Sequence, residues 1–171
     1  ESLDKHIAPL VADGLPITSM TADVLKDDGI GAIIERARKM PGELYGLVTV
    51  VGGTDPHWAA ATKIPRKVWE NMFSLNLDSM FFMTRAFAAE LRAQGRPGSL
   101  VSISSTAGLT ANPYQIGYGS AKAALIATVK TMALELASAG IRVNNIAPRL
   151  GHLLVVGAEN YSMVSSRQIR L

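Results

Sequence analysis

Three polar residues of one stretch have the types and the spacing for proton transfer at an oxygen. Tyr118 and Lys122 lie four positions apart at the start of a long Ala-rich helical pattern, so both side chains point from one face. An ordinary tyrosine has a pKa of about 10, and a nearby lysine cation favours its phenolate. Ser105, at the end of a predicted strand, can hydrogen-bond the same substrate oxygen. This set predicts acid–base catalysis, although the Tyr-x-x-x-Lys spacing alone is also a frequent chance surface pair.

The sequence around these residues carries a family resemblance. ISSTAG at the strand end and YGSAKAA on the helix strongly resemble the short-chain dehydrogenase/reductase (SDR) family, and the resemblance runs from about Thr18 to Pro148. It implies an NAD(P)-dependent oxidoreductase that interconverts an alcohol and a ketone or aldehyde by hydride transfer. Tyr118 would then be the acid/base, Lys122 would lower its pKa and hold the ribose hydroxyls, and Ser105 would polarise the substrate oxygen.

The same resemblance assigns roles to residues outside this stretch. Asn76, an amide among apolar neighbours in SLNLDSMF, matches an asparagine that bends its helix and holds a water near the catalytic lysine. The alternative is a purely structural amide. Asp23 and Val24 match a turn that contacts the adenine, while Asp23 is equally suited to cap the next helix. Gly52 and Pro148 match positions where the backbone passes close to the ribose and the nicotinamide.

The chain also departs from the family pattern. The family's Asn-Asn-Ala-Gly reads Thr-Val-Val-Gly here, ending at Gly52, and Arg149 stands where a glycine follows the proline. The glycine-rich turn that receives the pyrophosphate does not occur in this sequence, and residues 150–171 do not resemble the family's substrate region. We expect this chain to be a part of a longer enzyme. The alternative is a truncated, non-catalytic SDR remnant that acts as a partner-binding or oligomerisation module.

The elements that must position these residues alternate along the chain. The apolar spacing predicts helices over residues 1–12, 28–40, 66–93 and 114–138, and strands over 16–20, 44–51, 100–105 and 141–146. Strand 44–51 is continuously apolar, which is typical of a parallel strand covered on both faces. The pattern predicts an α/β, Rossmann-like doubly wound parallel sheet with helices on both faces, incomplete, over residues 1–148, followed by an atypical tail over 149–171.

Composition sets outer bounds on the function. The chain has 171 residues, 48% hydrophobic and 18% charged, which indicates one globular domain rather than a disordered chain. Its net charge of +3 is spread along the sequence, so nucleic-acid binding has little support. Cysteine is absent, which excludes disulfides and thiolate metal sites and fits a reducing cytoplasm. We expect a cytoplasmic homodimer or homotetramer, formed through the two long helices, that acts on a small molecule.

Overall fold

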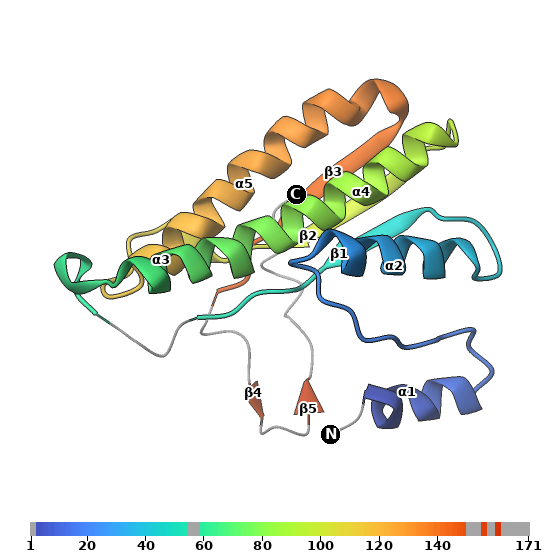
Figure 1. Cartoon of the computed structure of the whole chain (residues 1–171), viewed down its shortest axis with the longest axis horizontal. Coiled ribbons are helices and arrows are strands. Elements are labelled where there is room, and N and C mark those ends of the chain that lie inside the picture. Colours follow the sequence, from blue (N-terminus) through green and yellow to red (C-terminus); the bar gives the residue numbers. More distant parts are fainter. Residues whose placement is uncertain (1–2, 55–58, 150–154, 157–159, 162–171) are drawn as a thin grey trace. The chain divides into compact units, whose positions relative to one another are not determined.

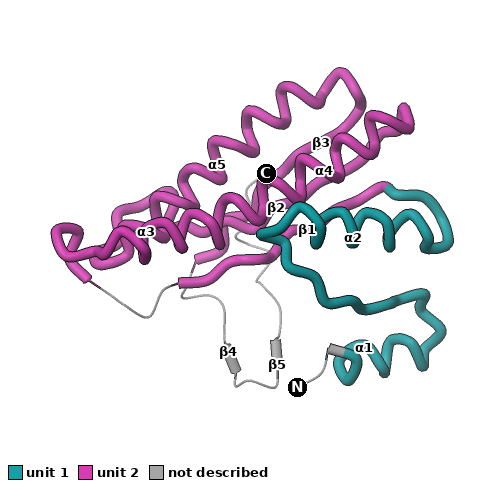
Figure 2. The backbone as a smooth tube through the Cα atoms, viewed as in Figure 1, with its two compact units in different colours: residues 1–44 teal, residues 45–171 magenta. Residues whose placement is uncertain are grey.

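The computed structural model describes residues 3–54, 59–149, 155–156 and 160–161. These residues form two compact units, residues 1–44 and residues 45–171 (Figure 2). The first unit holds Asp23 and Val24, and the second holds the other candidate site residues. Most of the tail, including everything from Ser162 onward, lies outside the described residues.

The first unit consists of two helices joined by an irregular segment. The helices are α1 (Leu3–Ala12) and α2 (Asp27–Arg38), as the apolar spacing predicts. Acidic residues in the first turn of α2 and arginines in its last turn complement the helix dipole. The strand predicted over residues 16–20 is wrong, because this segment has no regular structure. A strand needs a neighbour for its hydrogen bonds, and the described part of the unit contains no other strand.

The turn before α2 is held by Asp23. Its carboxylate accepts a hydrogen bond from Leu25 N–H at 3.0 Å, and its carbonyl accepts one from Lys26 N–H at 3.1 Å. The N-cap of α2 is Lys26, with no side-chain capping bond, so the alternative that Asp23 caps this helix is not what the structure shows. Gly29 lies against the turn, since a Cβ there would be 2.1 Å from the Asp23 carbonyl oxygen.

The second unit is built on a parallel sheet, as expected. Its strands are β1 (Gly46–Thr49), β2 (Gly98–Ile103) and β3 (Ile141–Ile146), in the order β1-β2-β3 (Figure 1). β1 is shorter than predicted and is an edge strand of these three. Val48 and Val50 are 63% and 67% exposed, so the expectation that this strand is covered on both faces is not met within the described residues.

Helices connect the strands on one face of this sheet. β1 leads through α3 (Arg66–Phe73), a π-helical segment (Ser74–Asp78) and α4 (Ser79–Ala93) to β2, and β2 leads through α5 (Ile116–Leu136) to β3. Because the strand order advances in one direction, two right-handed crossovers place α4 and α5 on the same face, where they pack together (Figure 1). The core beneath them contains the buried side chains Met80, Leu91, Leu100, Leu125 and Ile141.

Short elements complete the second unit. One-turn 3₁₀ helices cover Ala61–Lys63, Thr106–Gly108 and Ala137–Ala139. Gly140, in the left-handed conformation with φ 69°, follows the last of these, which is typical of a glycine that ends a helix. Near the C-terminus, β4 (Val155–Val156) pairs antiparallel with β5 (Asn160–Tyr161). Residues 153 and 154, which precede β4, lie outside the described residues.

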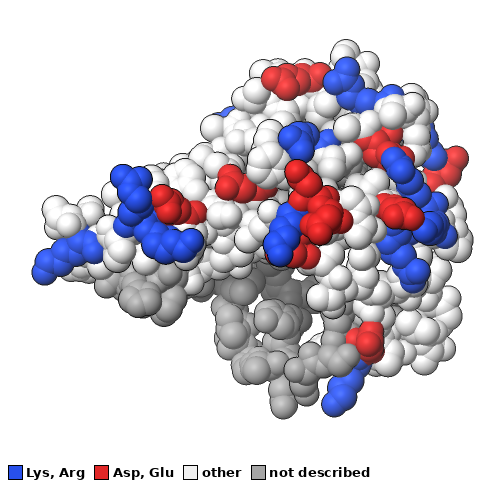
Figure 3. Space-filling view, in the orientation of Figure 1, with Lys and Arg blue, Asp and Glu red and all other residues white. Residues whose placement is uncertain are grey.

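The surface charges are mixed in sign. On the face seen in Figure 3, lysine and arginine side chains lie beside aspartate and glutamate side chains. Among the described residues, ion pairs join Arg66 to Glu70 at 3.8 Å and Lys39 to Glu35 at 2.6 Å. Among the described residues, no helix combines the length and the hydropathy that a bilayer crossing requires.

The close approach of α2 to its preceding turn gives a paired test. We expect Gly29→Ala to lower the free energy of unfolding by about 1–3 kcal/mol, because the added methyl group meets the Asp23 carbonyl. Gly31 lies on the same helix with no atom within 4 Å of a Cβ, so Gly31→Ala should raise stability by up to about 1 kcal/mol. Urea unfolding measures both. Equal effects of the two substitutions would show that the turn does not rest on α2.

Candidate active site

The candidate residues of the second unit gather where the parallel strands end. Gly52 follows β1, Ser105 follows β2, and Pro148 follows β3. Carboxyl ends of parallel strands share one edge of a sheet, and ligands of open α/β sheets bind there. The structure therefore brings together, at one edge, residues that lie up to 96 positions apart (148 − 52) in the sequence.

Lys122 is a buried cation at this edge. Its side chain projects from the second turn of α5, and the residue is only 4% exposed. Its Nζ donates a hydrogen bond to the Ile103 carbonyl oxygen at 3.2 Å and lies 5.7 Å from the ring centroid of Tyr118. Burial lowers the pKa of Lys122, because a desolvated ammonium is less stable than a hydrated one. Among the described residues, no carboxylate forms an ion pair with it.

Asn76 lies in the π-helical segment that interrupts the long helix predicted over residues 66–93. It is fully buried, and its Nδ2 donates to the carbonyl oxygens of Met72 at 3.0 Å and Gly53 at 2.9 Å. Its Oδ1 accepts from Gly53 N–H at 3.0 Å. The side chain thereby bonds the segment after β1 to the helix. Short π segments are rare and frequently occur at functional sites.

Gly52 lies directly against these two side chains. Its φ is +153°, and a Cβ at this position would be 2.7 Å from Asn76 Oδ1 and 3.0 Å from Lys122 Nζ. Any side chain would therefore meet the amide and the ammonium as well as an unfavourable backbone conformation. Gly52, Asn76 and Lys122 form one cluster, which we call the glycine–amide–lysine cluster.

Ser105 and Pro148 are brought to each other by the backbone. Ser105 is extended (φ −162°), and its Oγ accepts a hydrogen bond from Ala107 N–H at 3.1 Å at the start of a 3₁₀ turn. The next residue, Thr106, donates its N–H to the Pro148 carbonyl oxygen at 3.0 Å. Because Ser105 Oγ serves as the acceptor for Ala107 N–H, Ser105 keeps its hydroxyl proton for a further acceptor.

Tyr118 is half-buried in the first turn of α5.

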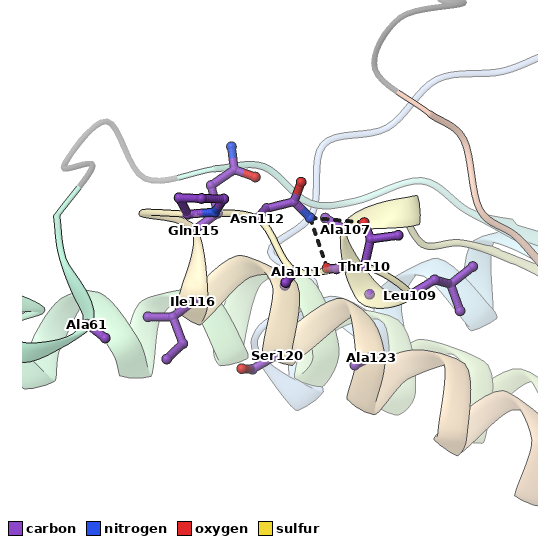
Figure 4. A pocket seen from close by; sticks show the side chains of 13 residues that line it. Ala61, Ala107, Leu109, Thr110, Ala111, Asn112, Gln115, Ile116, Ser120 and Ala123 are labelled. Carbon is purple, nitrogen blue, oxygen red and sulfur yellow. Dashed lines mark hydrogen bonds between the residues drawn. The ribbon is translucent and has the colours of Figure 1, made fainter.

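The structure also contains a pocket that the sequence did not indicate. It has a volume of about 580 Å³ and lies between the loop over residues 107–113 and the start of α5 (Figure 4). Ile116, Ser120 and Ala123 line it from α5. Their spacing places them on the face of α5 that is opposite to Tyr118 and Lys122. The only sequence signal was a run of turn and small residues, which any loop can contain.

Comparison with protein families matches residues 1–152 to the family described as short chain dehydrogenase. Human dehydrogenase/reductase SDR family member 4 is 31% identical over 150 residues, covering 88% of this chain and 53% of that protein. A 3-oxoacyl-[acyl-carrier-protein] reductase from Synechocystis is 32% identical over 145 residues, covering 85% of this chain and 58% of that protein. The chain thus spans little more than half the length of these relatives.

A solved structure shows the same fold. The structure of ElxO with NADP bound superposes with a TM-score of 0.76 at 28% identity, covering 85% of this chain and 59% of that one. This match confirms the Rossmann-like α/β fold class expected from the strand and helix pattern. Since the family match extends over 152 of the 171 residues, the chain belongs to the short-chain dehydrogenase family.

Proposed function

We propose that the protein containing this chain is an NAD(P)-dependent oxidoreductase that interconverts an alcohol and a ketone or aldehyde. The observation that carries the proposal is the buried ammonium of Lys122 at the carboxyl edge of the sheet. An ammonium has three donors, and the described residues use one of them, on the Ile103 carbonyl. A buried lysine without a carboxylate partner is costly for folding, so a ligand with hydroxyl groups is a fitting recipient for the remaining donors.

Each candidate residue takes a role that its contacts support. Tyr118 gives or takes the proton of the substrate oxygen, and the ammonium of Lys122 lies 5.7 Å from the centroid of its ring. Ser105 donates its free hydroxyl proton to the same oxygen. Asn76 anchors a water relay that leads toward Lys122, because its amide fixes the π-helical segment beside that ammonium.

The described residues fit a nicotinamide dinucleotide. Lys122 has free donors for ribose hydroxyls, Gly52 has no side chain that would displace the Lys122 ammonium, and Pro148 follows β3 at the same edge. The adenine contact of Asp23 and Val24 is proposed from the family resemblance alone. When bound, the dinucleotide supplies the hydride chemistry at the substrate carbon. The substrate is a small-molecule alcohol or carbonyl compound, and the differing names of the two relatives set no narrower class.

Domain limits and cellular location extend this proposal. We assign residues 1–148 to a partial Rossmann-like SDR domain and residues 149–171 to an atypical tail. The cytoplasm is the proposed location. The given sequence has no cysteine and so forms no disulfides, which fits a reducing compartment.

A non-catalytic SDR remnant that binds partners remains the competing function. Burying an ammonium without a carboxylate partner costs stability, and a non-catalytic module would gain nothing in return. The glycine–amide–lysine cluster therefore favours the enzyme. Titration of the protein with NADH and NADPH separates the two functions. Saturable binding supports the enzyme, whereas no binding of either coenzyme up to millimolar concentration supports the remnant.

An exposed apolar stripe on α5 supports a homodimer or homotetramer formed through residues 66–93 and 114–138. Leu134 is 82% exposed, and Ile116 is 42% exposed. With Ala123 and Ala127, which are also exposed, they are spaced by 7, 4 and 7 residues and share one helix face. Trp69 on α3 adds a further exposed apolar side chain. Exposed apolar surface of this kind on a helix is typical of protein interfaces.

The role of Tyr118 is tested by removing one oxygen atom. Tyr118→Phe should lower kcat by roughly 10²- to 10⁴-fold, because the acid/base is lost, while coenzyme binding stays nearly unchanged. Tyr114→Phe is the matched control, since Tyr114 lies four residues earlier and is 60% exposed. Full activity of Tyr118→Phe in steady-state assays would refute the assignment.

The buried state of Lys122 predicts a pH dependence of stability without coenzyme. Burial lowers the pKa of Lys122 below its ordinary value of 10.5, so the unfolded chain binds more protons than the folded chain between the two pKa values. The contribution of Lys122 to the free energy of unfolding must therefore rise with pH in that window. It reaches its full value at the upper end.

Comparison with Lys122→Met isolates this effect. The unfolding free energy of the wild type relative to Lys122→Met should increase as the pH rises toward 10.5, the ordinary pKa of the lysine side chain. Lys130→Met provides the control, because Lys130 is an exposed lysine on the same helix. A flat difference for Lys122→Met, equal to that of the control, would show that Lys122 is solvated.

The proposed interface is tested at Leu134. Leu134→Lys should shift the protein from oligomer toward monomer, because a charged side chain would have to be desolvated in the interface. Leu109→Lys is the control, since Leu109 is 64% exposed but lies in the loop before α5. Sedimentation equilibrium measures the mass. A monomeric wild type, or equal masses for wild type and Leu134→Lys, would contradict this interface.

A further inference from the structure

Two pairs of polar side chains lie on the helix-covered face of the sheet, near its carboxyl edge. Thr49 Oγ1 donates to Ser102 Oγ at 3.0 Å between β1 and β2. Asn145 Nδ2 donates to Ser104 Oγ at 2.7 Å between β3 and the end of β2. Asn145 is registered opposite Ser102, so its side chain reaches two residues forward along the neighbouring strand. Ser104 immediately precedes Ser105, the residue proposed to bind the substrate oxygen.

The protons of the second pair can be assigned from its bonds. Ser104 Oγ donates its single proton to the Ile146 carbonyl oxygen at 3.3 Å. It can therefore only accept from Asn145, which orients the amide with Nδ2 toward Ser104. The other end of the amide, Asn145 Oδ1, is buried and has no hydrogen-bond partner among the described residues.

Stability alone is a poor reason for an amide at this position. A buried acceptor without a partner carries its full desolvation cost, and β-branched apolar residues suit a half-buried strand better than asparagine. Within the described residues, the side chain of Asn145 forms one hydrogen bond, which is the bond to Ser104. Its gain must therefore be sought in what Ser104 holds in place.

Ser105 lies between two backbone hydrogen bonds that join the ends of β2 and β3. Ser104 N–H donates to the Ile146 carbonyl at 2.8 Å, and Thr106 N–H donates to the Pro148 carbonyl at 3.0 Å. The Asn145–Ser104 bond adds a side-chain link one residue before Ser105. Together they restrict the backbone that presents the Ser105 hydroxyl, and small displacements of a catalytic group have large effects on rate.

We propose that Asn145 is a positioning residue, which holds Ser105 in its reactive place through the hydrogen bond to Ser104. This proposal rests on the proposed function, because Ser105 positions a substrate oxygen only if the protein is a dehydrogenase or reductase. It adds Asn145 to the candidate residues Ser105, Tyr118, Lys122 and Asn76.

Asn145→Leu tests the proposal, because leucine has nearly the same shape and lacks the amide. We expect kcat to fall by roughly ten- to a hundredfold, with the KM for coenzyme unchanged and the melting temperature not lowered. Asn144→Leu is the matched control, since Asn144 is the exposed neighbour on the same strand. Ser104→Ala should show the same fall, and the double variant Asn145→Leu with Ser104→Ala should be no slower than either single variant. If Asn145→Leu does not fold, Asn145→Ser replaces it.

Hydrogen exchange of the backbone amides of Ser104 and Thr106 provides a readout that does not require activity. Both should exchange faster in Asn145→Leu than in Asn144→Leu. Unchanged exchange, a kcat equal to that of the control, or additive losses in the double variant would each overturn the proposal. An inactive wild type that binds no coenzyme would instead refute the proposed function, and the exchange rates alone would then decide whether Asn145 orders this turn.

Discussion

The contact of the Gly52 backbone with Asn76 and Lys122 is the constraint on which the second unit depends. Asn76 bonds both the N–H and the carbonyl of Gly53, and Lys122 bonds the carbonyl that ends β2. Through these bonds the end of β1, the π-helical segment and α5 meet at one point. A side chain at Gly52 would separate them. The π-helical segment is therefore part of the site, because it carries Asn76 to this point.

The polarity of this region is costly for a small sheet. An ammonium, an amide and four hydroxyl- or amide-bearing strand residues lie on or beside the face that α4 and α5 cover. Apolar residues would pack there without any desolvation penalty. Natural sequences break local rules of this kind mainly at functional sites, where the loss in stability is offset by pre-organisation. The buried polar groups and the family motifs therefore indicate the same edge of the sheet as the location of the candidate site.

Some features of this chain differ from what its family membership alone would suggest. Val50 stands where the family resemblance places an asparagine, and it is 67% exposed. Arg149, also exposed, follows Pro148 in place of a glycine. The Gly53 backbone, which forms two hydrogen bonds with the Asn76 side chain, closely follows Val50 and Val51 in the chain. Under the proposed function, contacts to a ribose here would come from the main chain and Lys122.

Local pattern and motif in the sequence predicted the helices and the three parallel strands, and they singled out Ser105, Tyr118 and Lys122 as candidates, because apolar periodicity and i,i+4 spacing are properties of neighbouring residues. Those signals failed for residues 16–20, since an extended segment becomes a strand only beside a partner. The family resemblance implied a bend of the helix at Asn76 but not its π-helical form, and nothing in the sequence indicated the pocket beside Ile116 or the pairing of Asn145 with Ser104. These features depend on contacts between residues that are distant in the sequence, or on hydrogen bonds that no local spacing encodes. Only the tertiary structure decided them, because only there do buried donors find their acceptors.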